Sequence, residues 1–172
     1  FADSMIEMDH RVGQLLDAVD ELGIEQDTLF IFASDNGPEF RRPWRGTAGP
    51  WTGTYHTAME GGLRVPLIVR WPGRVPAGGV SDDIVHVTDL YATLVAAAGG
   101  SVPDDRPIDG INQLAWWTGQ APHSAREGFL FYIKGELRAA KWRHWKLHFV
   151  FESEPNQGPK HLETPWLFNI KR

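Results

Sequence analysis

The spacing of apolar residues changes once near the start of the chain, and the change separates a helix from a strand. Between residues 2 and 22 apolar side chains recur every three or four positions, which predicts an amphipathic helix that ends at Gly23. Glu7 and Arg11 lie one turn apart on its polar side and are expected to pair. Residues 28–33 are β-prone and apolar on both faces, which predicts a strand buried in a parallel sheet. A helix followed by a buried strand is half of an α/β unit.

The middle of the chain alternates between loops and short regular segments. Residues 37–63 have no clear period and contain six Gly and three Pro, which predicts a long loop that is either functional or disordered; its aromatic and Arg content favours an ordered one. Residues 63–71 read as a second strand, closed by a turn at Trp71-Pro72-Gly73. Thr88 is a plausible N-cap for a helix over residues 89–98, and residues 110–117 predict a further short helix.

From Gly128 onward the pattern changes to short strands that follow one another without helices. The expected strands cover residues 129–133, 137–142, 146–151 and 166–170, with Arg143-His144 as a hairpin connection. Such a succession predicts an antiparallel sheet. The chain is therefore expected to consist of an α/β part at residues 1–105 and a linker, short helix and small β subdomain at residues 106–172.

Composition narrows the class of protein. The chain has 172 residues with 42% hydrophobic and 23% charged residues, which is typical of a globular protein. A net charge of -5 argues against nucleic acid as a partner, and no apolar run approaches the roughly 18 residues that cross a bilayer. Zero cysteines exclude disulfides, zinc-thiolate sites and a Cys nucleophile. No signal peptide is visible, and the compartment stays open.

Asp35-Asn36-Gly37 follows directly after the first predicted strand. Ligands bind outside the carboxyl ends of strands in an open α/β sheet, and a carboxylate beside an amide oxygen suits Ca²⁺ or Mg²⁺. The alternative is an ordinary turn or helix cap, because these residues also form turns for local reasons. Two ligands cannot satisfy a metal that takes about six oxygens, so any site needs ligands from elsewhere.

Several ordered segments resemble the sulfatase family of the alkaline-phosphatase-like superfamily. The segments are MIEMDHRVGQLLDAVDELGIEQDTLFIFASDNG, MEGGLRVPLIVRWPG, HVTDLYATLVAAAG, DGINQL, KWRHWKLHF and WLFNI. The resemblance implies an α/β fold, a partial alkaline-phosphatase-like (sulfatase) sandwich with a small C-terminal antiparallel β subdomain.

By this resemblance Asp35 and Asn36 match the family's second pair of ligands to an active-site Ca²⁺, with Mg²⁺ or Mn²⁺ as alternatives. The family hydrolyses sulfate esters through a formylglycine made from Cys or Ser in a C/S-x-P-x-R motif. That motif occurs nowhere in the 172 residues, and the family's Asp-Asp metal pair is also missing. The resemblance therefore implies a C-terminal portion of a sulfatase, which would self-associate through exposed sheet or pair with an N-terminal half.

Three residues near the turn are candidates for contact with the substrate. Sulfatases carry a Lys a few residues before E-G-G; that place falls on Tyr55, with His56 beside it, and either side chain could donate to a sulfate oxygen. Arg45 in the preceding loop could clamp an anionic ester, although surface charge is the common alternative. Glu60 and Arg64 are expected to form a structural ion pair.

Other polar residues have simpler interpretations. Helix capping explains Asp89 without a metal shared with His86, and the histidines at 144, 148 and 161 are expected on the surface. Three functions follow as hypotheses: a sulfatase-type hydrolase acting on a small-molecule or sugar sulfate ester, a metal-binding module that self-associates without turnover, and a weak metal-dependent hydrolase of phosphate or sulfate esters.

Overall fold

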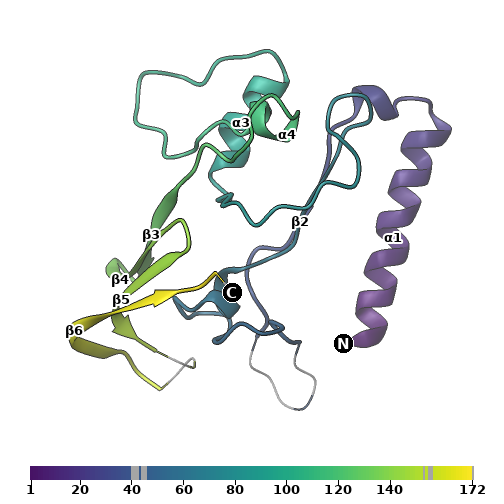
Figure 1. The fold of residues 1–172 in the computed structure, drawn as a ribbon. Helices are drawn as coiled ribbons and strands as arrows, with labels where there is room; N and C mark the ends of the chain where they lie inside the picture. Colours follow the sequence, from purple (N-terminus) through teal and green to yellow (C-terminus); the bar gives the residue numbers. More distant parts are fainter. Residues whose placement is uncertain (40–42, 44–45, 153, 155–156, 172) are drawn as a thin grey trace.

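The computed structural model describes residues 1–172 apart from 40–42, 44–45, 153, 155–156 and 172. Along the chain the elements are α1 (Ala2–Glu21), η1 (Glu25–Asp27), β1 (Phe30–Ala33), α2 (Glu60–Leu63), β2 (Leu67–Arg70), α3 (Asp89–Ala97), α4 (Leu114–Trp117), β3 (Gly128–Ile133), β4 (Glu136–Trp142), β5 (Trp145–Phe151) and β6 (Lys160–Asn169). In Figure 1, α1 stands to one side of the β1–β2 ribbon, α3 and α4 lie together, and β3 to β6 form a separate sheet.

The predicted N-terminal helix is confirmed as α1. Arg11 Nε donates to Glu7 Oε1 at 2.8 Å, as expected for a pair one turn apart. The helix ends where Gly23 takes a positive φ of 65° and donates its N–H to the Asp20 carbonyl. No residue of α1 is buried by the described part of the chain, and the Ile6 side chain is 69% exposed. Along the apolar stripe, Met8 and Leu15 are exposed, whereas Val12, Leu16 and Val19 are partly covered.

β1 and β2 form an antiparallel pair, so the prediction of a parallel sheet at residues 28–33 is wrong. Phe30 lies opposite Arg70, and Ala33 lies opposite Leu67. A parallel neighbour needs a crossover, usually a helix, whereas the described residues of the connection here form only the single turn of α2. An apolar run of four residues does not indicate the direction of the neighbouring strand.

β2 and the helices after it follow the predicted positions with shorter bounds. The turn after β2 is confirmed, because Arg74 and Val75 both donate to the Trp71 carbonyl. α3 matches the predicted helix, but Thr88 makes no side-chain cap hydrogen bond. Instead the first residue of the helix, Asp89, accepts the N–H of His86 through its own carboxylate. None of the described helices is long and apolar enough to cross a membrane.

The C-terminal sheet is an antiparallel meander in the order β3-β4-β5-β6, as predicted. The hairpin at residues 143–144 is confirmed, since Trp142 pairs with Trp145 and Arg143 takes a positive φ of 51°. β6 is ten residues long and begins earlier than the predicted 166–170. The core of the sheet contains Phe131 and Ala139 together with Ala58 from the loop before α2. This loop is therefore anchored on the sheet although it is distant in sequence.

Candidate functional site

The segment Ser34–Gly37, called the metal turn below, is held mainly by its own hydrogen bonds. Asp35 is exposed, and one of its carboxylate oxygens accepts the Asn36 N–H at 2.9 Å. The Asn36 side-chain amide donates to the Gly37 carbonyl at 3.0 Å, which leaves its own carbonyl oxygen as an acceptor. The turn therefore offers carboxylate and amide oxygens, which are ligands for a hard divalent cation. In the parts of the chain that the structure describes, no group of three or more His, Cys, Asp or Glu residues is placed to hold a metal ion.

Residues 51–62, called the glycine loop below, pack directly against the metal turn. Gly37 donates its N–H to the Gly62 carbonyl at 2.9 Å. A Cβ on Gly37 would lie 1.9 Å from the Gly61 carbonyl oxygen, which is closer than any real contact allows. Gly61 in turn donates to the Thr52 carbonyl at 2.8 Å, so the backbone of the loop folds closely on itself. The glycines of E-G-G are required by contacts within the loop: an added Cβ would lie 2.4 Å from the Gly53 carbonyl oxygen at Gly61 and 2.2 Å from the Thr54 carbonyl oxygen at Gly62.

Tyr55 and His56 lie in the glycine loop beside the metal turn. The Tyr55 N–H donates to the Pro38 carbonyl at 3.0 Å, two residues after Asn36. His56 is exposed and adopts a positive φ of 67°, an uncommon conformation for a residue other than glycine. The two rings contact each other with centroids 4.0 Å apart. The structure therefore brings these predicted residues next to the metal turn, whereas Arg45 lies outside the described residues.

The predicted ion pair of Glu60 with Arg64 is confirmed and belongs to a larger cluster. Arg64 Nε donates to Glu60 Oε2 at 2.7 Å, Lys141 Nζ to Oε2 at 2.9 Å, and Lys146 Nζ to Oε1 at 2.8 Å. Glu60 is 7% exposed and Lys146 is 1% exposed. One carboxylate therefore receives three cations, two of which come from the C-terminal sheet.

The protonation of this cluster follows from its charge balance. Burial alone would raise the pKa of Glu60, but the charge of Lys146 and the hydrogen bond from Arg64, with further help from Lys141, lower it to about 2. Burial lowers the pKa of Lys146 to about 8, because the attraction of Glu60 only partly offsets the loss of solvent. The carboxylate is thus firmly ionised, and the three cations Arg64, Lys141 and Lys146 surround its single negative charge.

The sequence also indicates that Lys141 and Lys146 lie opposite each other, although the prediction of the site did not include them. A two-residue connection at Arg143-His144 pairs Trp142 with Trp145 and therefore Lys141 with Lys146. Like charges directly opposite each other on one face of a sheet repel, so a buried pair of lysines requires an anion between them. Glu60 is that anion.

The prediction that the histidines of the C-terminal sheet lie on the surface is wrong for His148. Its side chain is buried at 3% exposure, with edge contacts to the rings of Phe151 and Phe168. Its Nδ1 has no hydrogen-bond partner among the described residues. Burial, together with the nearby charge of Lys146, lowers the pKa of His148 to about 4. The ring is therefore neutral near pH 7.

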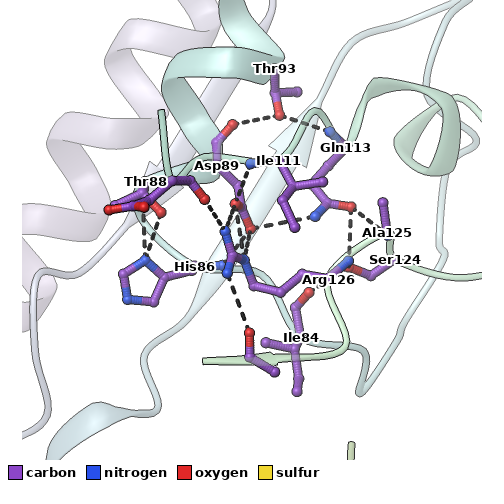
Figure 2. Close-up of polar contacts among 12 residues, drawn as sticks. Ile84, His86, Thr88, Asp89, Thr93, Ile111, Gln113, Ser124, Ala125 and Arg126 are labelled. Atoms are coloured by element: carbon purple, nitrogen blue, oxygen red, sulfur yellow. Dashed lines mark hydrogen bonds and ion pairs between the residues drawn. The ribbon is translucent and has the colours of Figure 1, made fainter. Parts of the chain in front are cut away.

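Asp89 belongs to a structural network and has no free position for a metal. Figure 2 shows its carboxylate facing the Arg126 guanidinium, with Nε–Oδ2 and Nη2–Oδ1 distances of 2.8 and 2.6 Å. The same carboxylate accepts the backbone N–H groups of His86 and Ile111. The hydrogen bonds from Arg126 and from these N–H groups outweigh burial, which would raise the pKa of Asp89, and hold it below its ordinary value. The network fixes the start of α3 to the segment before β3.

Two hollows lie near the glycine loop. The larger, about 540 Å³, is lined by both carboxylates and cations, and among the cations Arg64 and Lys141 already pair with Glu60 and Arg143 with Glu127. The other, about 400 Å³, is lined by Pro38 next to the metal turn and by Trp51 to Thr54 of the glycine loop. The second hollow lies beside Pro38, two residues after the candidate ligand Asn36, and has a volume suited to a small ligand.

Comparisons with known proteins agree with this arrangement. Residues 1–101 match the family model described as Sulfatase, and residues 55–148 match the model described as N-sulphoglucosamine sulphohydrolase, C-terminal. Arylsulfatase D of Homo sapiens is 33% identical over 201 residues, covering 100% of this chain and 34% of the relative. Steryl-sulfatase of Mus musculus is 35% identical over 170 residues, covering 92% of this chain and 27% of the relative.

Solved structures give the same result. The crystal structure of the PsFucS1 sulfatase from Pseudoalteromonas sp. matches with a TM-score of 0.89 and 32% identity, over 98% of this chain and 36% of that chain. Ps i-CgsB in complex with k-i-k-neocarrahexaose matches with a TM-score of 0.72 and 31% identity, over 94% of this chain and 34% of that chain. The chain spans about a third of the length of the relatives it matches. By the family model that covers more than half of its residues, the chain belongs to the sulfatase family.

Proposed function

We propose that this chain is part of a sulfatase-type hydrolase that cleaves sulfuric esters, in which Asp35 and Asn36 ligate a divalent cation. The observation that carries the proposal is the packing of Gly37 against Gly61 and Gly62, because it sets the two oxygen ligands beside the glycine loop in a chain of the sulfatase family. Ca²⁺ is the preferred ion, since it accepts a mixture of carboxylate and amide oxygens in irregular geometry. Mg²⁺ and Mn²⁺ are the alternatives.

A cation bound at this turn would supply Lewis-acid stabilisation of the negative charge on the ester oxygens. The chain's own residues then have separate roles. Asp35 and Asn36 hold the ion, while His56, when protonated, and the Tyr55 hydroxyl donate hydrogen bonds to sulfate oxygens. The C/S-x-P-x-R motif that yields the family's formylglycine is not among the 172 residues, so these residues serve binding and charge stabilisation, and the nucleophile is not one of them.

The substrate class follows from the hollow beside the metal turn and from the relatives. A space of about 400 Å³ with Trp51 and several threonine and glycine residues on its wall suits a sugar ring or a small aromatic group. The solved relative Ps i-CgsB was crystallised with a neocarrahexaose, and curated relatives are named as arylsulfatases and steryl-sulfatases. We therefore propose a sulfated sugar or small-molecule sulfate ester as substrate, with phosphate esters as poorer substrates.

The test is the hydrolysis of p-nitrophenyl sulfate and p-nitrophenyl phosphate by the intact gene product that contains residues 1–172. Rates are measured with Ca²⁺, Mg²⁺ or Mn²⁺ added after chelation. The sulfate ester should be cleaved faster than the phosphate ester, and Asp35→Ala should lower the rate by about 100-fold or more, as expected for loss of a group that stabilises developing charge. Faster cleavage of the phosphate ester, or sulfate turnover that survives Asp35→Ala, would overturn the proposal.

A second candidate property, self-association, is favoured by the exposed apolar side chains of α1 and β2. Met8 and Leu15, two turns apart on one face of α1, are 37% and 59% exposed, and Ile68 on β2 is 60% exposed. Apolar side chains gathered on regular elements are typical of surfaces that contact another protein surface. A second copy of the chain is the partner that we propose, and a concentration series in sedimentation tests it.

A further inference from the structure

We propose that Glu60 is a positioning residue of the candidate metal site, and that its ion pairs with Lys141 and Lys146 tie the metal turn to the four-stranded sheet. The inference rests on the proposed role of Asp35 and Asn36 as metal ligands. Glu60 itself does not contact the turn, so it acts through the two glycines that follow it.

The first link joins the sheet to Glu60. Lys141 and Lys146 are opposite each other on β4 and β5, and both ammonium groups reach the same carboxylate at 2.9 and 2.8 Å. Lys146 Nζ also lies 4.3 Å from the centre of the Phe131 ring, in the core of the sheet. Because the lysines are buried, each has lost its solvent and depends on Glu60 for compensation. The carboxylate is therefore held at one place on the face of the sheet.

The second link joins Glu60 to the metal turn. Gly61 and Gly62 follow Glu60 in α2, and they touch Gly37 so closely that no side chain fits between them. Gly37 is adjacent to Asn36 and donates its N–H to the Gly62 carbonyl. A shift of Glu60 on the sheet thus moves the contact that fixes the end of the metal turn, whereas the side-chain hydrogen bonds that the turn makes among the described residues stay within Ser34–Gly37.

The chain offers a matched control on the same strand. Arg138 on β4 is buried at 6% exposure and pairs with Glu136 and Glu152, neither of which lies in the glycine loop. Lys141→Met and Arg138→Met therefore each remove one buried cation from β4. Only the first removes a partner of Glu60.

The experiment is hydrogen–deuterium exchange at the Gly37 amide, read together with calorimetric titration of Ca²⁺, in the intact gene product. Lys141→Met should raise the Gly37 exchange rate about tenfold and weaken Ca²⁺ binding about tenfold, while Arg138→Met should change neither by more than about twofold. Glu60→Gln should have a larger effect, because it leaves Lys141 and Lys146 opposed without an anion. If Glu60→Gln does not fold, Lys141→Met decides alone, since Arg64 and Lys146 still pair with Glu60.

Two results would overturn the inference. One is an unchanged Gly37 exchange rate and Ca²⁺ affinity in Lys141→Met; the other is an equal rise of Gly37 exchange in Arg138→Met, which would indicate general loosening of the sheet. A different result would overturn the proposed metal site while leaving this inference intact. If the unmodified protein does not bind Ca²⁺ but Gly37 exchange still responds to Lys141→Met alone, the tie between sheet and turn stands and the proposed role of Asp35 and Asn36 is wrong.

Discussion

Gly37 follows the two proposed metal ligands and has no room for a side chain. Gly37→Ala would place a Cβ 1.9 Å from the Gly61 carbonyl oxygen, so the turn or the loop has to move. We expect a loss of about 1–3 kcal/mol in the free energy of unfolding, as for other overpacked sites. Gly13→Ala is the matched control, because nothing lies within 4 Å of its added Cβ. In the middle of α1 that change should stabilise the protein by roughly 0.5–1 kcal/mol. Urea unfolding measures the stability of both variants. Equal changes in the free energy of unfolding would contradict the close packing at Gly37.

His148 should make stability depend on pH in a range where Glu60 does not titrate. In the folded protein its pKa is about 4, against 6.5 for the free side chain, so below pH 6.5 the unfolded chain binds a proton that the folded chain does not. The stability that the neutral ring contributes is therefore complete above pH 6.5 and is lost as the pH falls through 4. Glu60 stays ionised down to about pH 2 when folded and changes charge only below pH 4.5 when unfolded.

Between pH 7 and pH 5, the difference in the pKa of His148 between the folded and the unfolded chain lowers the free energy of unfolding by about 2 kcal/mol. His148→Leu should lose correspondingly less over the same interval, because the titrating group is gone. Urea unfolding at the two pH values measures both proteins. The same loss in both would show that His148 is not the group responsible.

At the scale of elements, the Asp89–Arg126 pair fixes the start of α3 to the segment that precedes β3. Asp89→Asn should lower the free energy of unfolding by about 3–5 kcal/mol, because it leaves the largely buried Arg126 without its counter-charge. Asp105→Asn is the matched control: it removes the carboxylate of an exposed pair with Arg106, and stability should not change measurably. Thermal unfolding measures the stability of both variants. A similar loss of stability in Asp89→Asn and Asp105→Asn would contradict the proposed structural role of Asp89.

The elements themselves could largely be predicted from the sequence, for reasons that differ between them. α1 and the C-terminal strands follow from apolar spacing and turn residues, which act over a few positions. The direction of β2 relative to β1 could not be predicted from the sequence, because it depends on the path that the long loop takes between the two strands. His148 was expected on the surface because the histidines of the β subdomain have no ligand spacing, whereas its burial results from the aromatic rings that the sheet brings around it.

The candidate site could be predicted in part. Asp35 and Asn36 follow the first predicted strand, Tyr55 and His56 are predicted by the resemblance to the sulfatase family, and the structure brings the two segments together. Lys141 and Lys146 were missed although their pairing follows from the two-residue hairpin, because the consequence depends on Glu60, which is 81 residues before Lys141. A contact over that separation is determined by packing and is not visible in local patterns.

For the whole molecule, the exposed apolar stripe of α1 predicts association between copies. Met8→Glu together with Leu15→Glu, two turns apart on one face of the helix, should shift the protein toward monomer in a sedimentation concentration series, because charges replace the proposed contact. Val80→Glu is the control, since Val80 is 97% exposed in a loop and belongs to no helix or strand. A protein that is monomeric at every concentration before any substitution would contradict the predicted association.

The central claim, that Asp35 and Asn36 ligate a divalent cation, is tested most directly by calorimetric titration of Ca²⁺ into the intact gene product and its Asp35→Ala variant. Asp104→Ala serves as the control, because Asp104 is an exposed carboxylate in a different loop. We predict that Asp35→Ala weakens Ca²⁺ binding by about 100-fold or more and that Asp104→Ala leaves it unchanged. Equal Ca²⁺ affinity in the unmodified protein and in Asp35→Ala would contradict the claim.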